Sequence, residues 1–263
     1  PRLVVDYKIT DEMMLWGSYT NGYKAGGFNS VEINSEFDNE DVDSYEIGTK
    51  AVWPDLRLSL NTSLFYYVYN DKQSIRLDNT SASGVPQYLV DSSDEEATGW
   101  DLQVQWQATE GLALNFNSQY IDQTYKNYIT RSGDDLSGQA TGVPEWSFAT
   151  GANYTWLFDN ASQLQLGVMY SYRGESRCND ASQSQGTCQA TPNFVTGESQ
   201  SRTDARIQWS SATDSWNMSG YVQNAFDEQY IGGVGGLTQD VFGTPHTSLS
   251  EPRRYGIEVG YQF

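Results

Sequence analysis

The sequence has no long hydrophobic run, and it contains little histidine, cysteine or positive charge. A stretch of about 18 apolar residues, which a membrane-spanning helix needs, does not occur. The 15 Lys and Arg residues stand against 34 Asp and Glu residues, and the resulting net charge of −19 argues against a nucleic-acid partner. The single histidine, His246, has no neighbour at metal-ligand spacing, and neither a phosphate-binding glycine loop nor a serine nucleophile motif is present. These absences predict that the protein is not an enzyme and carries no resident metal or cofactor.

Apolar and polar side chains alternate along several segments, as they do in a strand whose two faces meet different surroundings. Such runs, about ten residues long, cover 56–66, 100–107, 146–156, 163–173 and 255–263. This length allows a tilted strand to cross a bilayer with its apolar face toward lipid and its polar face toward a wet lumen. A strand of a soluble β-sandwich alternates too, so a single run does not distinguish the two folds. The repetition of such runs along the chain favours the membrane barrel. The pattern predicts an all-β protein, an antiparallel transmembrane β-barrel.

The alternation also predicts which side chains face lipid and which face the lumen. The residues expected to point outward are Leu58, Leu102, Val104, Leu166 and Val259. Those expected to point into the barrel are Asn61, Gln103, Gln105, Gln165 and Glu258.

Breaks in the alternation are short and long in turn. Turn-forming residues mark the short breaks at 10–12, 54–55, 109–111, 159–162 and 212–215. The long breaks fall near 25–40, 71–96, 127–142, 174–200 and 228–250. This succession predicts about eleven strands with tight turns at one end and long connections at the other, as in bacterial outer-membrane barrels.

Tryptophan placement agrees with a barrel in a membrane, because such barrels gather aromatic rings at the two water interfaces. Six of the eight tryptophans lie within four residues of a short break: Trp16, Trp53, Trp106, Trp156, Trp209 and Trp216. The other two, Trp100 and Trp146, lie at the opposite ends of their strands. We therefore expect an aromatic girdle at each interface.

An odd strand count suggests that more strands exist elsewhere. Bacterial single-chain barrels have even counts, and an open sheet would leave two unpaired edges in lipid. The chain also opens on Pro1 without a signal segment. We expect a fragment, whose edges at 3–9 and 255–263 pair with strands from an N-terminal portion or from a second polypeptide.

A series of short motifs runs through the whole chain. In order they are 22–29 (GYKAGGFN), Glu40 with 44–50 (SYEIGTK), 97–102 (ATGWDL), Leu136, Gly138, Pro144 and Trp146, 204–206 (DAR), 222–230 (VQNAFDEQY), and 253–256 (RRYG) leading to Phe263. In this succession they resemble the C-terminal half of TonB-dependent outer-membrane receptors. Trp100-Asp101 replaces the common Val-Glu, and Ala225 replaces the usual leucine, and neither change alters the expected fold.

The resemblance implies a barrel of about 22 strands, of which residues 1–263 supply the C-terminal part. It also implies an N-terminal plug, absent from this sequence with the first barrel strands, through which the receptor engages the TonB complex. The implied activity is energised import of a ferric siderophore or a similar scarce nutrient across the bacterial outer membrane. The implied surroundings are lipopolysaccharide and outer-membrane lipid. A passive porin, a surface-recognition β-protein without transport, and an outer-membrane protease or phospholipase are the alternatives.

Ligand contacts in such a receptor are expected from the external connections and the upper lumen, where aromatic rings and cations can stack on or pair with an anionic chelate. The residues so placed are Tyr23, Lys24, Arg131, Arg173, Arg177 and Phe194. Arg173 is the best placed because it is in phase with the lumen-facing Gln165 and Ser171. Its alternative role is an ion pair with a neighbouring strand. At the C-terminus, Tyr261 and Phe263 match the aromatic signal by which the family's barrels are recognised for assembly.

Two further features lie in the expected external connections. Cys178 and Cys188 share a polar stretch, which predicts a disulfide in an oxidising compartment, with two free thiols as the alternative. Acidic residues gather in two groups near external strand ends: Asp38, Glu40, Asp41 and Asp43, and Asp91, Asp94, Glu95 and Glu96. We expect a solvated acidic rim. Oxygen-rich groups of this kind can also bind calcium or bridge to lipopolysaccharide, although the spacing matches no EF-hand.

Overall fold

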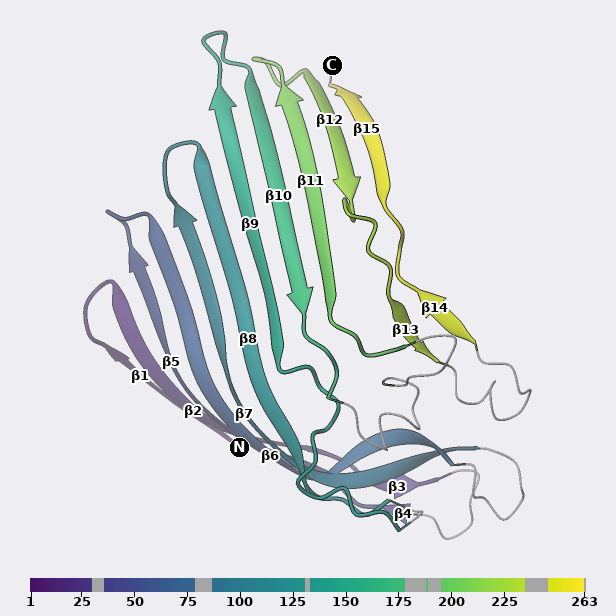
Figure 1. Ribbon diagram of the computed structural model, residues 1–263. Helices are drawn as coiled ribbons and strands as arrows, with labels where there is room; N and C mark the ends of the chain where they lie inside the picture. The colour runs from purple at the N-terminus through teal and green to yellow at the C-terminus, as the bar shows by residue number, and fades with distance from the viewer. Residues whose placement is uncertain are drawn as a thin grey trace.

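The computed structural model describes residues 1–29, 36–78, 87–130, 133–177, 188, 195–234 and 246–262. These residues form one antiparallel sheet of eleven strands in the order β1-β2-β5-β6-β7-β8-β9-β10-β11-β12-β15 (Figure 1). Its strands are β1 (Arg2–Lys8), β2 (Met13–Lys24), β5 (Glu40–Trp53), β6 (Leu58–Asp78), β7 (Gln87–Gln107), β8 (Leu112–Asn127), β9 (Trp146–Leu157), β10 (Gln163–Arg173), β11 (Gln200–Ser210), β12 (Trp216–Gln223) and β15 (Arg254–Tyr261). The predicted all-β antiparallel fold and its strand number are confirmed.

Short turns join the strands at one end of the sheet, and long connections join them at the other (Figure 1). Three of the short turns contain a non-glycine residue with positive φ, namely Arg57, Ala161 and Asp214. Two of the long connections carry small hairpins, β3 (Gly27–Phe28) with β4 (Glu36–Phe37), and β13 (Ile231–Val234) with β14 (Thr247–Leu249). The described residues contain no helix that is long and apolar enough to cross a membrane.

The strand register sorts apolar and polar residues onto separate faces. Between β6 and β7, Leu60 pairs with Val104, and the next pair along the strands is Asn61 with Gln103. Successive side chains point to opposite faces, so each apolar pair shares one face and each polar pair the other. The same sorting continues to the C-terminal edge, where Val259 pairs with Met218 and Glu258 with Ser219. All ten residues of the predicted register lie on the expected faces.

The polar face is the inner one. A single recess is lined by Val52 of β5, Gln105 of β7 and Met169 of β10, although these strands are far apart in the sheet. Side chains from distant strands can converge only on the concave side of a curved sheet. The external connections fold over the same side, where Val143 packs against Phe65 and its neighbours.

Aromatic rings on the outer face form two rows. The row near the long connections includes Tyr19 beside Tyr45, with ring centroids 5.1 Å apart, and Trp100 beside Trp146, 5.6 Å apart. The row near the short turns includes Tyr154 with Trp156 (4.3 Å) and Trp216 with Tyr261 (4.7 Å). Ten residues separate the two tryptophans of β9, which is roughly 33 Å along a strand and roughly 25 Å across a bilayer at a tilt of about 40°. The rows therefore have the separation of two membrane interfaces.

Trp16 is an exception to the girdle prediction. It pairs with Gly48 on the inner face, out of phase with Leu15 and Tyr19 on the outer face. Gly48 leaves space for its ring, because a Cβ there would lie 2.8 Å from ring atom Cε2. The distance of a residue from a turn predicts its height in the membrane but not its face, and so the placement of Trp16 in a lipid-facing girdle was wrong.

The predicted connection at 71–96 is also wrong in extent. Strands β6 and β7 continue far beyond the aromatic row near the long connections. Residues 72–78 pair with 87–93 after an irregularity between Tyr69 and Lys72. A strand with water on both sides needs no apolar face. The alternation that marks a strand inside the membrane is then lost, although the backbone pairing persists.

The sheet does not close on itself. Strands β1 and β15 lie at its two ends, and among the described residues these two strands do not pair with each other (Figure 1). Both edges therefore present backbone N–H and C=O groups that no described strand satisfies.

Candidate ligand-binding site

A recess of about 640 Å³ lies on the inner face, beneath the long connections. Its described lining comes from β6, β8, β9, β10 and β11, from two connections and from β13. The lining residues are Tyr67, Gln119, Ile121, Tyr125, Thr141, Gly142, Val143, Pro144, Ser147, Arg173, Ser176, Gly197, Gln200, Ile231 and Gly232. Its volume lies within the range of small-molecule sites in proteins.

The floor of the recess is apolar. Phe65, Ala97 and Ile121 form a buried cluster on the inner face, and Tyr67 and Val143 pack against it. The rings of Phe65 and Tyr67 are stacked, with centroids 5.3 Å apart. These residues break the polar pattern of the inner face. The sequence analysis missed these apolar inner-face residues, although the unbroken aromatic run at 65–67 was a signal of them.

The connection after β8 supplies one wall. It returns along the strand, where Tyr125 N donates to Gln139 O at 2.9 Å and Ile121 N donates to Glu145 O at 2.9 Å. Gly138 and Gly142 have φ of 79° and 90°, a backbone region that side chains rarely allow. This backbone pairing holds Thr141 to Pro144 against the recess.

The last long connection is anchored at its base, and this brings Ile231 to the recess. Asn224 is buried, and its Nδ2 donates to Glu228 O at 2.7 Å and to Glu251 O at 3.1 Å, joining the two limbs of the connection. Tyr230 Oη accepts from Ser201 N at 2.8 Å and donates to Ser201 O at 3.1 Å, which fixes the connection to β11. The motif at 222–230 therefore positions a wall of the recess.

Arg173 lies at the end of β10, opposite Gln200 and Ser147, and it is the only charged residue in the described lining. It is exposed and makes no ion pair with any residue that the structure describes. It also borders a smaller recess of about 280 Å³ near Tyr230. The guanidinium is therefore available to an anionic group in the recess. Its role as a ligand contact stays a prediction.

Arg177 has partners within the protein. Its Nη1 lies 2.7 Å from Asp122 Oδ1 and 2.9 Å from Glu145 Oε1, and its Nη2 donates to Gln123 O at 2.6 Å. Asp122 pairs with Thr98, in phase with the outer-face residues of β7. Arg177 does not line the recess, and in this arrangement it ties the connection after β10 to β8.

The other predicted contacts do not converge on the recess. Tyr23 is exposed on the outer face, opposite Asp41. Lys24 lies on the inner face, where its Nζ is 3.8 Å from Glu40 Oε2. Arg131 and Phe194 lie outside the described residues, and so does Phe263 of the assembly signal. None of these placements tests a ligand contact.

Cys188 is buried and disulfide-bonded, and no cysteine among the described residues is free. Its expected partner, Cys178, lies outside the described residues, so their pairing stays a prediction.

The acidic groups behave differently from a uniform solvated rim. Glu95 is buried on the inner face, where its Oε2 lies 2.7 Å from Lys72 Nζ and also accepts a hydrogen bond from Gln123. Asp91 accepts from Tyr128 Oη at 3.0 Å. Glu95 is therefore a packed, paired carboxylate and not a rim residue. No group of three or more metal-ligating side chains with suitable geometry occurs in the described parts of the chain.

One carboxylate in a connection has a shifted pKa. The side chain and the backbone N–H of Ser137 hydrogen-bond to Asp135, and they hold the pKa of this exposed carboxyl below its usual value. The bonds favour the charged form and stabilise the turn in which both residues lie.

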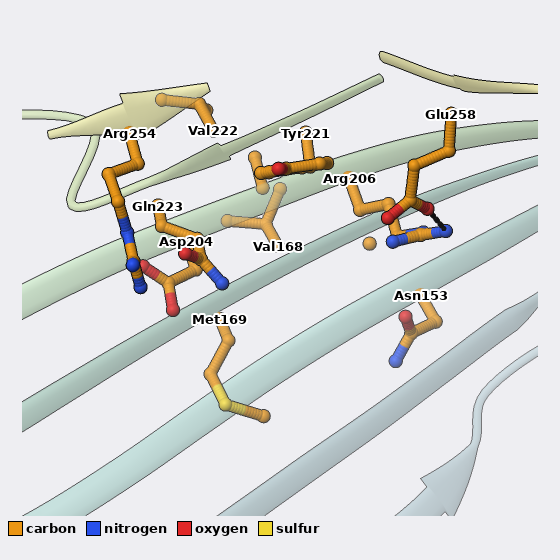
Figure 2. Close-up of a pocket in the computed structure, with 12 residues that line it drawn as sticks. Asn153, Val168, Met169, Asp204, Arg206, Tyr221, Val222, Gln223, Arg254 and Glu258 are labelled. Carbon is orange, nitrogen blue, oxygen red and sulfur yellow. Dashed lines mark hydrogen bonds and ion pairs between the residues drawn. The ribbon is translucent and has the colours of Figure 1, made fainter. Parts of the chain in front are cut away.

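A separate ionic cluster lies on the inner face of the last strands (Figure 2). Arg206 Nη2 donates to Glu258 Oε2 at 2.6 Å and to Ser219 Oγ at 2.7 Å, so it reaches from β11 across β12 to β15. Nearby, Arg202 Nε lies 2.9 Å from Asp204 Oδ1. The recess beside these residues measures about 540 Å³. Arg206 and Glu258 form an ion pair with one another. Arg173, by contrast, forms no ion pair with any described residue.

Comparisons with known proteins agree with this architecture. A family model described as "TonB dependent receptor-like, beta-barrel" matches residues 1–225. The chain is 25% identical to the pesticin receptor of Yersinia pestis over 240 residues, which cover 87% of this chain and 31% of that protein. It is 27% identical to the metal-pseudopaline receptor CntO of Pseudomonas aeruginosa over 185 residues, or 70% of this chain and 24% of the relative.

The fold is similar to the crystal structure of the ferric yersiniabactin uptake receptor FyuA from Yersinia pestis. The TM-score is 0.73 at 20% identity, and the match covers 98% of this chain and 36% of the FyuA chain. The chain thus spans between 24% and 36% of the length of these three proteins.

Proposed function

Because the chain belongs to the TonB-dependent receptor family, whose β-barrel model matches residues 1–225, we propose that it forms the C-terminal part of an outer-membrane receptor. This receptor imports a ferric siderophore or a similar scarce metal chelate, with energy from the TonB complex. The observation that carries the proposal is the inner recess beneath the external connections, which combines aromatic walls with the guanidinium of Arg173. The names of the relatives, receptors for metal-pseudopaline and ferric yersiniabactin, support a metal chelate as the cargo.

The outer membrane is the proposed location. The two aromatic rows on the outer face fit the two interfaces of a bilayer, and the band between them is apolar. Lipid and lipopolysaccharide are the proposed surroundings of this face. Tyr261 packs against Trp216 in the row near the short turns, with the two rings tilted by 46°, and there it fits an assembly signal together with Phe263.

The remaining barrel strands are proposed partners of this sheet. Each unsatisfied backbone group in hydrocarbon costs several kcal/mol, and the bare edges of β1 and β15 would expose on the order of ten such groups. Additional strands of the same receptor satisfy both edges and close the barrel. A plug inside that barrel provides the contact with the TonB complex.

Uptake by cells tests this function. Cells with the intact gene are expected to accumulate radioactive iron supplied as a siderophore complex, and deletion of the gene or of TonB is expected to abolish accumulation. Uptake that persists without TonB and without a proton gradient would instead indicate a passive porin. A receptor that binds at the surface but never delivers iron would indicate a recognition protein without transport.

A further inference from the structure

The recess differs in charge from the rest of the chain. The sequence holds 34 acidic and 15 basic residues, yet the described lining of the recess contains no carboxylate and a single cation, Arg173. Other cations near the recess are paired elsewhere. Arg202, two residues from Gln200, is paired with Asp204. Arg177 is paired with Asp122 and Glu145, and Lys72 is paired with the buried Glu95.

The walls of the recess favour a ligand with an apolar surface. Tyr67 and Tyr125 present rings, and Ile121, Val143 and Ile231 present aliphatic groups. The polar lining consists mainly of neutral side chains that can donate or accept hydrogen bonds, such as Gln119 and Gln200. A volume of about 640 Å³ suits a compact molecule of small-ligand size.

Charge limits the ligand further. One guanidinium can pair with both oxygens of one carboxylate or with the oxygen of one phenolate. A charge-assisted contact of this kind is strong when water is excluded. A ligand with several negative charges would find no second cation among the described lining residues, and it would meet the acidic surface of a chain with net charge −19. A polyanionic chelate is therefore disfavoured at this site.

We propose that the ligand is a compact metal chelate with a largely apolar or aromatic surface and a single negative charge, and that Arg173 selects this charge. The inference rests on the proposed function and specifies its substrate class. It assigns Tyr67, Tyr125 and Ile121 to the body of the chelate and Arg173 to its anionic group.

The test uses the intact receptor in detergent and three ferric complexes of different charge. The probes are a singly negative complex of an aromatic phenolate-carboxylate chelator, an uncharged tris-hydroxamate complex and a polyanionic tris-catecholate complex. Affinity is measured by quenching of protein fluorescence. The singly negative complex is expected to bind about tenfold or more tightly than either of the others.

Variants of Arg173 test its role in charge selection. Arg173→Gln is expected to remove most of the advantage of the singly negative complex while it changes affinity for the uncharged complex less than about twofold. Arg173→Lys should restore part of the advantage, because it restores the charge without the planar fork. Lys126→Gln is the matched control, since it removes an exposed cation near the end of β8 that does not line the recess, and it should leave the affinities unchanged. Heat-modifiable migration verifies that each variant folds.

The outcomes separate this inference from the proposed function. Tightest binding of the tris-catecholate, or an equal loss for charged and uncharged complexes in Arg173→Gln, would overturn the inference alone, provided that uptake still requires TonB. Failure of all three complexes to bind, together with the absence of TonB-dependent iron uptake, would overturn both.

Discussion

The outer and inner faces of the sheet are built by the same strands, yet they are organised on different principles. The outer face repeats one theme, apolar side chains between two aromatic rows, from β2 to β15. The inner face changes along its height and circumference, from an apolar floor at Ile121 to the ion pair of Arg206 with Glu258. A single surrounding medium determines the outer face. Particular partners determine each part of the inner face.

The strongest test of this contrast places the same cation on each face of one strand. Leu102→Arg would put a guanidinium on the outer face of β7, and its neighbour Gln103→Arg would put one on the inner face. We expect Leu102→Arg to destabilise the intact receptor by about 2 to 4 kcal/mol and Gln103→Arg to have little effect. Urea unfolding in lipid vesicles measures both. Equal costs at the two positions would show that β7 does not separate lipid from a wet lumen.

The second test removes a specific inner-face partner. Lys72→Met leaves the Glu95 carboxylate, whose side chain is 5% exposed, without its cation. Lys72 itself is 32% exposed, so water compensates in part, and we expect a loss of about 2 to 3 kcal/mol. Hydrogen exchange along the projecting part of β6 and β7 measures the loss locally.

The matched control for that test is Lys24→Met. Lys24 is 62% exposed and lies 3.8 Å from Glu40, so its removal should cost less than about 1 kcal/mol. Adding Glu95→Gln to Lys72→Met should recover part of the stability, because the buried charge is then gone. If the double variant is no more stable than Lys72→Met, the loss came from packing and not from the charge.

The same contrast explains how far the sequence could predict this structure. Alternation located eleven strands and the face of every residue in the predicted register, because one rule, apolar outward and polar inward, holds along these strands. No such rule acts inside. The partners of Arg177 come from two other segments, and the buried state of Glu95 depends on Lys72 and Gln123, contacts that no local pattern reveals.

The candidate site shows the same limit. Arg173 was found because it continued the polar phase of its strand, whereas the walls formed by Val143 and Ile231 come from connections that fold back over the sheet. The position of Trp16 was missed for a related reason, since its space is created by Gly48 on the neighbouring strand.

The third test uses two glycines on adjacent strands. A Cβ at Gly48 on the inner face would lie 2.6 Å from Thr62 O and 2.8 Å from the ring of Trp16, so Gly48→Ala forces a shift and should cost about 1 to 3 kcal/mol. A Cβ at Gly17 on the outer face would have its nearest neighbour, Glu46 O, at 3.7 Å. Gly17→Ala should therefore be close to neutral. Urea midpoints of the two variants give the comparison, and a neutral Gly48→Ala would mean that the ring of Trp16 has room to move.

The smallest expected effect belongs to the pair of Arg206 and Glu258, whose side chains are 48% and 58% exposed. Water screens such a pair, so a double-mutant cycle with Arg206→Gln and Glu258→Gln should give only a weak coupling that falls further as salt is raised. A strong coupling that is insensitive to salt would mean that water is excluded from these side chains in the intact receptor. Because the described residues leave the cluster open to the lumen, the excluding element would be a part of the receptor outside them, lying against β11, β12 and β15. The cycle therefore measures whether the ionic part of the inner face is a wet wall or a covered contact.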